Sequence, residues 1–348
     1  MRLLVTALAS VSQPTGLAVY ARMVSERLVA RSRDEADVVS WEGRRGSSLA
    51  LAVARQRWLY LELDAAAGAA RADAVLHLLP EVGRTRRPQV VVLHDVVPLV
   101  AETTWRQRLY FRTVVTHATR SAAGVIADSE QTQSDAIQIL GVAPARVVVV
   151  YPGVDLDRYR PSSDDDRPRM PFILAVGSHA PHKRLGLLMR GFAASSIAST
   201  HELHIVGPAS RFTAALVALR DFLGLASRVR VLPYDSPEEL AQRYGRADLY
   251  ASMSSYEGFG LPALEALASG VPVVVTDVGA ARAYVGRAGI VLPREVDVAG
   301  AASALEQGVA LSVDPKVRAL ARRQAEGFSW DRTASGLVEA VRGFTSLD

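Results

Sequence analysis

Two glutamates flank a glycine-rich loop and offer the clearest chemistry in the chain. The stretch Tyr256–Gly270 reads YEGFGLPALEALASG and places Glu257 eight residues before Glu265. Glycines on both sides of Phe259 let the backbone approach a ligand, and Pro262 suits the first turn of a helix. Backbone amides at such a helix start suit a diphosphate, and the two carboxylates can reach the groups on either side of it. In the alternative interpretation, Glu257 caps the helix and Glu265 is solvated.

A lysine follows a predicted strand over residues 172–176, in the sequence VGSHAPHKRLG. Only two of the forty basic residues are lysines, so Lys183 stands where the composition favours arginine. A lysine beside a glycine-containing strand end can serve as a compact positive charge for a phosphate. The alternative is a surface lysine on the first turn of the next helix.

A histidine and an aspartate, His94 and Asp95, end the apolar run VVVLHD in the first half of the chain. A histidine at this place can be an acid or base, a ligand to a hydroxyl, or a buried structural residue, and Asp95 can orient its ring. Gly16 follows the first predicted strand and opens the first predicted helix. Ser129 suits the N-cap of a later helix.

Strands and helices alternate along the whole chain, which predicts an α/β architecture. Most strand candidates are continuous apolar runs, typical of parallel strands covered on both faces. Because open parallel sheets bind ligands at the carboxyl ends of their strands, we expect Glu257, Lys183 and His94 to lie at such ends. The expected helices include residues 17–31, 105–121 and 130–140. The expected strands are residues 2–9, 36–41, 73–79, 90–97, 124–128, 147–151, 172–176, 203–206, 229–232, 249–252, 271–276 and 289–292.

A polar stretch over residues 161–171, PSSDDDRPRMP, interrupts this alternation and predicts a linker. We therefore expect two doubly wound parallel-sheet domains, residues 1–160 and residues 172–328, facing a central cleft. Apolar residues at helical spacing predict a C-terminal helix within residues 329–348. This helix can cross back to the first domain.

The composition excludes several classes of protein. The chain is 49% hydrophobic and 22% charged and has no cysteine, which excludes a disordered chain, a collagen, a disulfide scaffold and thiol chemistry. It has no run of about 18 uncharged apolar residues, so we expect a soluble, cytoplasmic protein. Residues 1–160 carry twenty basic and sixteen acidic residues, and the remainder is neutral. This surplus fits an anionic partner or a membrane surface and is too sparse for a nucleic-acid partner.

The glutamate pair within EGFGLPALEALASGVPVV resembles the donor site of retaining glycosyltransferases of family 4, which have the GT-B fold. The resemblance extends over almost the whole chain. It implies two Rossmann-like domains, the first binding the acceptor and the second binding a nucleotide-sugar donor.

The resemblance also implies roles for individual residues. Glu257 contacts the donor sugar near the reacting carbon, Glu265 holds the nucleotide ribose and Lys183 binds the diphosphate. His94 lies beside the donor sugar, so that His94 and Glu257 are the catalytic candidates, with Asp95 as an auxiliary group. The remaining implied diphosphate contacts are made by Gly16, Phe259, Gly260 and Leu261.

The chain departs from the family pattern at three positions. Ser178 and His182 stand where an arginine is often found, and Thr15 stands at the usual second glycine of the first loop. We expect Ser178 and His182 to be auxiliary groups. His182 or Arg184 can supply the hydrogen bonds that the missing arginine would donate.

The implied reaction transfers a hexose from a nucleotide-diphosphate sugar, with GDP-mannose favoured, to a hydroxyl of a glycan or lipid-linked acceptor, with retention of configuration. No metal and no cofactor are expected, because metal-ligand spacings are missing and Asp164–Asp166 falls in the linker. Arginines in loops 43–48 and 83–87 are candidates for the acceptor or for peripheral contact of the first domain with the inner membrane face. Two alternatives stay open: a GT-B epimerase or disaccharide phosphorylase, and a non-catalytic nucleotide-sugar binding protein.

Overall fold

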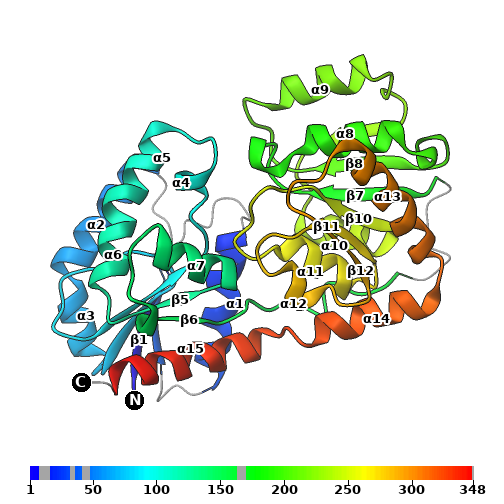
Figure 1. Cartoon of the computed structure of the whole chain (residues 1–348). Coiled ribbons are helices and arrows are strands. Elements are labelled where there is room, and N and C mark those ends of the chain that lie inside the picture. Colours follow the sequence, from blue (N-terminus) through cyan, green and yellow to red (C-terminus); the bar gives the residue numbers. More distant parts are fainter. Residues whose placement is uncertain (8–15, 32–35, 41–47, 163–169, 347–348) are drawn as a thin grey trace. The chain divides into compact units, whose positions relative to one another are not determined.

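The chain divides into two compact units, each built on its own parallel sheet (Figure 1). One unit comprises Met1–Gly153 and Trp330–Asp348, and the other comprises Val154–Ser329. Residues 154–160, which we expected in the first domain, therefore belong to the second unit. The computed structural model describes residues 1–7, 16–31, 36–40, 48–162 and 170–346. Asp164–Asp166 and most of the loop 43–48 lie outside these residues.

A six-stranded parallel sheet of order β2-β1-β3-β4-β5-β6 forms the centre of the first unit. Val5 of β1 lies between Val38 of β2 and Leu76 of β3, which sets the register of these strands. The chain order reverses between β1 and β3, which is the topological switch point of this sheet. Its strands are β1 (Leu3–Ala7), β2 (Ala36–Ser40), β3 (Ala74–His77), β4 (Gln89–Leu93), β5 (Gly124–Ala127) and β6 (Val147–Val149).

Polar side chains cap two helices of the first unit, α5 and α7. Ser129 accepts a hydrogen bond from the Thr132 amide at the start of α7, as its N-cap position predicts. The expected helix over residues 105–121 is present as α5, a π-helical turn η1 (Phe111–Val115) and α6 in direct succession. The α-helices are α1 (Gly16–Arg31), α2 (Ser48–Leu61), α3 (Leu63–Ala69), α4 (Val97–Val100), α5 (Trp105–Tyr110), α6 (Thr116–Ser121), α7 (Glu130–Gln138) and α15 (Trp330–Thr345).

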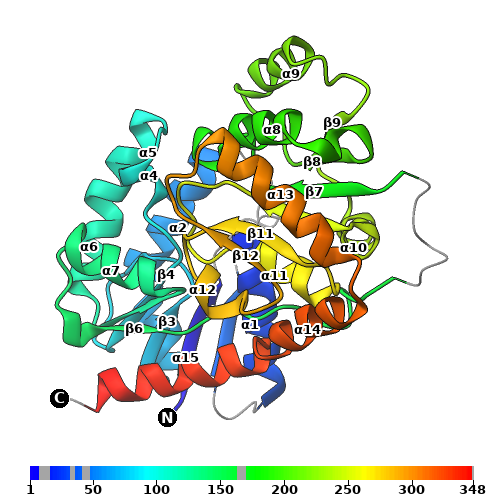
Figure 2. The same ribbon diagram turned by 45° about the vertical axis from the view of Figure 1, so that its right-hand side comes forward.

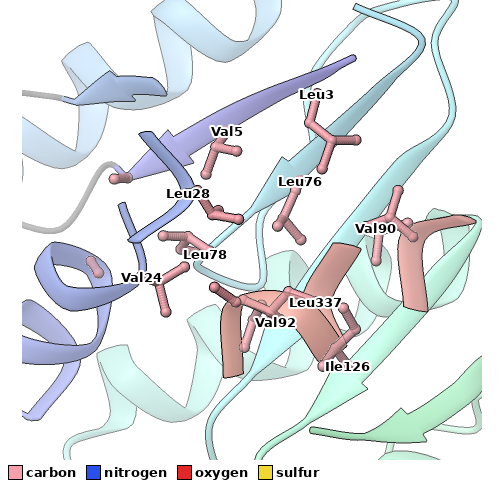
Figure 3. Close-up of a cluster of buried hydrophobic side chains, with 14 of the residues drawn as sticks. Leu3, Val5, Val24, Leu28, Leu76, Leu78, Val90, Val92, Ile126 and Leu337 are labelled. Carbon is pink, nitrogen blue, oxygen red and sulfur yellow. The ribbon is translucent and has the colours of Figure 1, made fainter. Parts of the chain in front are cut away.

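The last helix, α15, completes the hydrophobic core of the first unit. Its Leu337 is buried in one cluster with Val24 of α1 and with Val92 and Ile126 of the sheet (Figure 3). Phe344 lies so close to β5 that a side chain at Gly124 would clash with its ring. The first unit is therefore assembled from two segments that are far apart in the sequence.

A second six-stranded parallel sheet, of order β12-β11-β10-β7-β8-β9, forms the centre of the second unit. Chain order reverses between β7 and β10, so the switch point of this sheet lies where these two strands are neighbours. Four of its strands have the expected bounds, and the other two differ by one or two residues. The strands are β7 (Phe172–Val176), β8 (Glu202–Val206), β9 (Val229–Leu232), β10 (Leu249–Ser252), β11 (Val273–Thr276) and β12 (Gly289–Leu292).

Helices cover both faces of this sheet (Figure 2). Phe192 of α8, Leu216 of α9 and Leu305 of α13 share a buried cluster with strand residues on one face, while α10, α11 and α14 lie together on the other. The helices are α8 (Leu185–Ala194), α9 (Thr213–Phe222), α10 (Pro237–Arg246), α11 (Leu261–Ala268), α12 (Ala281–Tyr284), α13 (Val298–Ser312) and α14 (Pro315–Glu326). No helix in the described part of the chain is long and apolar enough to span a membrane.

Candidate functional site

The loops that follow β7 and β10 carry the residues of the candidate site in the second unit. These strands are neighbours at the switch point, so their carboxyl ends bring Gly177–Arg184 close to Ser254–Gly260. The His182 carbonyl accepts a hydrogen bond from the Ser255 amide at 2.7 Å and joins the two loops directly. Open α/β sheets place ligands at this position.

A charge pair lies at the centre of this site. The Lys183 Nζ donates hydrogen bonds to both carboxylate oxygens of Glu257, at 2.7 and 2.8 Å. The Ser254 hydroxyl donates to the Glu257 Oε1 at 2.6 Å. Burial alone would raise the pKa of Glu257, but the Lys183 charge and these hydrogen bonds lower it below its usual value. Glu257 is therefore an ionised carboxylate.

The backbone directly after β7 has a conformation that favours glycine. Gly177 has a φ of +150°, and a side chain there would lie 3.4 Å from the Lys183 Cε.

Arg184, which we expected as a substitute phosphate ligand, donates instead to the Arg294 carbonyl and to Glu295. His182 has a lowered pKa, first because of burial and then because of the Lys183 charge, and its Nδ1 is buried without a partner. A neutral imidazole therefore stands beside Lys183, with Ser178 in the same loop.

A left-handed glycine starts the helix that follows the glutamate loop. Gly260 is the N-cap of α11 with a φ of +103°, and a side chain there would lie 2.4 Å from the Tyr284 hydroxyl oxygen. Phe259 is buried, with ring centroids 5.5 Å from Tyr284 and 6.2 Å from Phe328. These contacts fix the turn that presents the Leu261 amide at the start of α11. Amides at a helix start carry the positive end of the helix dipole.

Glu265 lies one turn further along α11, among aromatic side chains. Burial raises its pKa from 4.5 to about 7, while the hydroxyls of Tyr244 and Tyr159 and the Arg158 charge oppose the rise. The alternative of a solvated Glu265 is therefore wrong. Our sequence analysis missed these tyrosines; Tyr234, which also interacts with Glu265, could have been found from its place after β9.

His94 lies in the first unit, at the carboxyl end of β4. Its Nδ1 is 2.6 Å from a carboxylate oxygen of Asp128 and its Nε2 is 2.9 Å from the Leu78 carbonyl. Burial would lower the pKa of His94, but the Asp128 carboxylate and the Leu78 carbonyl raise it above 6.5. Tyr20 of α1 packs edge-on against the ring, with centroids 4.7 Å apart. The histidine is thus held in place on three sides.

Asp128 orients the His94 ring, a function that we expected of Asp95. Asp95 instead accepts a hydrogen bond from the Val97 amide at 2.9 Å, at the start of α4. Asp128 was missed although its position directly after β5, the neighbour of β4, signals the same edge of the sheet. Gly16 opens α1, and Thr15 before it lies outside the described residues.

The arginines of loop 83–87 lie at the opposite edge of the first sheet. This loop leads directly into the amino end of β4, and the Gly83 amide donates to the side chain of Gln89. Asp64 of α3 accepts hydrogen bonds from Thr85 and from the Arg86 amide. Our prediction that these arginines contact the acceptor or a membrane therefore concerns the end of the sheet opposite to His94.

Comparisons with known proteins agree with this architecture. A match to "Glycosyltransferase Family 4" covers residues 14–158, and a match to "Glycosyl transferases group 1" covers residues 170–310. The chain belongs to glycosyltransferase family 4. Its two parallel sheets are those of the two Rossmann-like domains of the GT-B fold.

Similar proteins include the D-inositol 3-phosphate glycosyltransferases of Rhodococcus opacus and Mycobacterium tuberculosis. The first is 36% identical over 250 residues, covering 66% of this chain and 54% of the relative. The second is 34% identical over 237 residues, covering 63% and 48%. The chain spans about half the length of the curated relatives it matches.

Solved structures with the same fold are more distant in sequence. Sucrose-phosphate synthase from Thermosynechococcus elongatus has a TM-score of 0.79 at 19% identity, covering 100% of both chains. Anabaena HepE in complex with UDP-glucose has a TM-score of 0.71 at 19% identity, covering 98% of this chain and 99% of HepE. These structures support the GT-B fold of this family 4 chain.

Proposed function

We propose that the chain is a retaining glycosyltransferase that moves a hexose from a nucleotide-diphosphate sugar to a hydroxyl of a glycan or lipid-linked acceptor. The observation that carries the proposal is the Lys183–Glu257 pair at the switch point, directly before the start of α11. It places a cation, a carboxylate and a helix start within one pair of loops. A diphosphate and an electron-poor sugar carbon need these three groups.

In this proposal, the positive groups stabilise the leaving group. Negative charge develops on the β-phosphate as the sugar departs, and the Lys183 ammonium and the amides of Gly260 and Leu261 face that charge. No metal ion is needed in this arrangement, and no cofactor is proposed. Transfer that persists in excess EDTA would support this part of the proposal, and loss of transfer would count against it.

The carboxylates act on the sugar and on the ribose. Glu257 is ionised and stabilises positive charge that develops at the anomeric carbon. Glu265 accepts hydrogen bonds from the ribose hydroxyls. In the first unit, Asp128 holds the His94 Nδ1. The Nε2, which contacts the Leu78 carbonyl, is therefore the atom that can form a hydrogen bond with a hydroxyl of the sugar or acceptor in place of that carbonyl.

Two donors and one further acceptor class have specific support. The sequence pattern favours GDP-mannose, whereas HepE, which shares the fold, was solved with UDP-glucose. The names of the relatives point to a phosphorylated polyol as an acceptor besides glycans and lipid-linked sugars. We also propose a cytoplasmic location, because the proposed donors are nucleotide sugars.

A thermal-shift series with UDP, GDP and dTDP tests the donor site. We expect one nucleotide to raise the melting temperature of the native protein and of Lys316→Ala, and not that of Lys183→Ala. No shift with any of them would contradict the transferase proposal. Incubation of the nucleotide sugar with inorganic phosphate and no acceptor then tests for a phosphorylase or an epimerase. Release of a sugar phosphate or an epimerised donor would replace the transferase by one of these.

A further inference from the structure

Three hydroxyl-bearing side chains lead from the sheet of the second unit to the Glu257 carboxylate. Ser252 is the last residue of β10, and Ser254 follows it two residues later. Their side-chain oxygens are 3.0 Å apart, and the Ser254 hydroxyl donates to the Glu257 Oε1 at 2.6 Å. Tyr250 of β10, which is only 3% exposed, interacts through its hydroxyl with Ser252. We call Tyr250, Ser252 and Ser254 the hydroxyl chain.

The hydrogen bonds of the hydroxyl chain have one direction. An ionised carboxylate can only accept, so the single proton of the Ser254 hydroxyl is committed to Glu257. Ser252 must therefore donate to Ser254, and its own oxygen is left to accept from Tyr250. Each proton of the chain thus points toward the carboxylate. Hydroxyls aligned in this way polarise one another and strengthen the last bond of the series.

Two neighbouring strands fix Ser254 in place. It is completely buried, and β10, from which it follows, lies between β7 and β11 in the sheet. The Thr276 hydroxyl at the end of β11 donates to the Ser254 carbonyl. The next residue, Ser255, donates through its amide to the His182 carbonyl in the loop after β7. The Ser254 hydroxyl is therefore presented by a backbone that is held from both sides.

The charges around Glu257 show what this hydroxyl contributes. The titratable or charged side chains that act on Glu257, or on which its charge acts, are Lys183, His182, Tyr250 and Tyr284. Burial would raise the pKa of Glu257, and the Lys183 charge with the hydrogen bonds from Lys183 and Ser254 lowers it. A diphosphate at Lys183 would draw this cation away from the carboxylate. The Ser254 hydroxyl is buried and neutral, so it can stay on Glu257.

We propose that Ser254 is a positioning residue, which holds the Glu257 carboxylate ionised and in place while a diphosphate occupies Lys183. Ser252 and Tyr250 act through it, because they strengthen its hydrogen bond. The proposal rests on the proposed function in assigning a diphosphate to Lys183 and the sugar to Glu257. A carboxylate that faces developing positive charge must keep its own charge in a largely buried site, and the hydroxyl chain supplies fixed dipoles for this purpose.

Single-turnover transfer with saturating donor, measured across pH, tests the role of Ser254. We expect Ser254→Ala to lower the maximal rate by roughly tenfold and to move the acid limb of the pH–rate profile up by about one unit, because a hydrogen bond to a charged group is lost. Nucleotide affinity should stay within about twofold of the native value, since the hydroxyl chain acts on the sugar end of the site. Ser252→Ala should slow transfer by about twofold, because it removes only the polarisation of the last bond.

A buried serine far from Glu257 along the chain gives the matched control. Ser312 of α13 is 3% exposed, and its hydroxyl donates to the Val309 carbonyl at 2.8 Å. Ser312→Ala should leave the rate and the pH–rate profile as in the native protein. A native pH–rate profile in Ser254→Ala, or equal slowing by Ser312→Ala, would overturn the proposal.

Urea unfolding of a double-mutant cycle tests the same hydrogen bond without any measurement of transfer. At neutral pH, Ser254→Ala should lower the midpoint urea concentration about twice as much in the native chain as in Glu257→Gln, because a hydrogen bond to a charged acceptor is about twice as strong as a neutral one. Equal losses in the two backgrounds would overturn the proposal. A native chain that transfers no sugar would contradict the proposed function alone, since the cycle still decides whether Ser254 stabilises the charge of Glu257.

Discussion

The Lys183 Nζ lies within hydrogen-bonding distance of both carboxylate oxygens of Glu257, so each charge is neutralised by the other. Their side chains are only 16% and 18% exposed. A diphosphate that binds Lys183 must compete with Glu257 for the same ammonium group. Under the proposed function, donor binding would free the carboxylate to turn toward the sugar and so couple occupation of the phosphate site to the reacting end.

Removing the lysine should affect binding and stability together. We expect Lys183→Ala to weaken nucleotide binding at least tenfold and to lower the free energy of unfolding by about 1–3 kcal/mol, because it leaves a largely buried carboxylate without its partner. Titration calorimetry and urea unfolding measure the two effects. Lys316→Ala, which removes the exposed second lysine, should change neither. Lys183→Ala/Glu257→Gln should regain part of the lost stability; no gain would show that the two charges are not coupled.

Glu257→Gln should separate binding from transfer. The amide keeps the shape of the side chain but cannot stabilise positive charge at the anomeric carbon, so we expect nucleotide affinity within about threefold of the native value and a transfer rate lower by roughly 100-fold. Single-turnover measurements with saturating donor report the rate. Full transfer activity in this variant would remove Glu257 from its proposed place beside the sugar.

The protonation of Glu265 should make stability fall as pH rises. Its pKa is raised from 4.5 to about 7, so the folded chain binds a proton that the unfolded chain has lost between these values. We expect the native protein to lose about 1–3 kcal/mol of unfolding free energy between pH 4.5 and 7 that Glu265→Gln does not lose. Urea unfolding across this range measures it. Nucleotide affinity should rise with pH in the same window, because the ionised carboxylate accepts the ribose hydroxyls; parallel pH profiles for both proteins would contradict this.

Asp128 should control the charge of His94. The raised pKa of this histidine contributes stability that is fully present below pH 6.5 and is lost as pH rises through the folded value. Asp128→Asn should therefore lower the His94 pKa and destabilise the protein by about 1–3 kcal/mol at pH 6, with a smaller difference at higher pH. NMR titration of the imidazole measures the pKa. Asp95→Asn is the control and should move it much less.

A methyl group at Gly260 tests the turn before α11. We expect Gly260→Ala to destabilise the second unit by about 2–4 kcal/mol, because a left-handed backbone is strained and the new Cβ meets the Tyr284 hydroxyl. Gly224→Ala is the matched control, since Gly224 has a φ of +69° with open space around it. Gly224→Ala should lower the free energy of unfolding by about 1 kcal/mol, because it adds only the backbone strain. Equal losses in the two variants would show that the Tyr284 contact carries no cost.

Sequence patterns predicted the position of each strand because buried parallel strands read as short apolar runs, but the predicted ends were less accurate. The expected strand over residues 90–97 extends four residues beyond β4 and reaches the start of α4. Lys183, Glu257 and His94 were correctly expected at carboxyl ends, since His94 directly follows such a run and the other two lie in the loops after theirs. We expected Asp95 to be the partner of His94 because it is the next residue in the chain. The carboxylate that contacts the ring is that of Asp128, which follows the adjacent strand.

Features that depend on packing could not be predicted from the sequence patterns. The π-helical turn within residues 105–121 leaves no mark in the apolar spacing. The tyrosines around Glu265 come from segments separated by many residues, so their meeting depends on the fold. Residues 154–160 join the second unit because Arg322 of α14 donates to the carbonyls of Leu156 and Tyr159.

The place of α15 in the first unit has a consequence for biosynthesis. During translation, the ribosome releases the whole second unit before the helix that buries Val24, Val92 and Ile126. The nascent first unit must wait with an uncovered apolar surface while its neighbour folds as an uninterrupted segment. The first unit, whose synthesis begins first, is therefore the last to be completed.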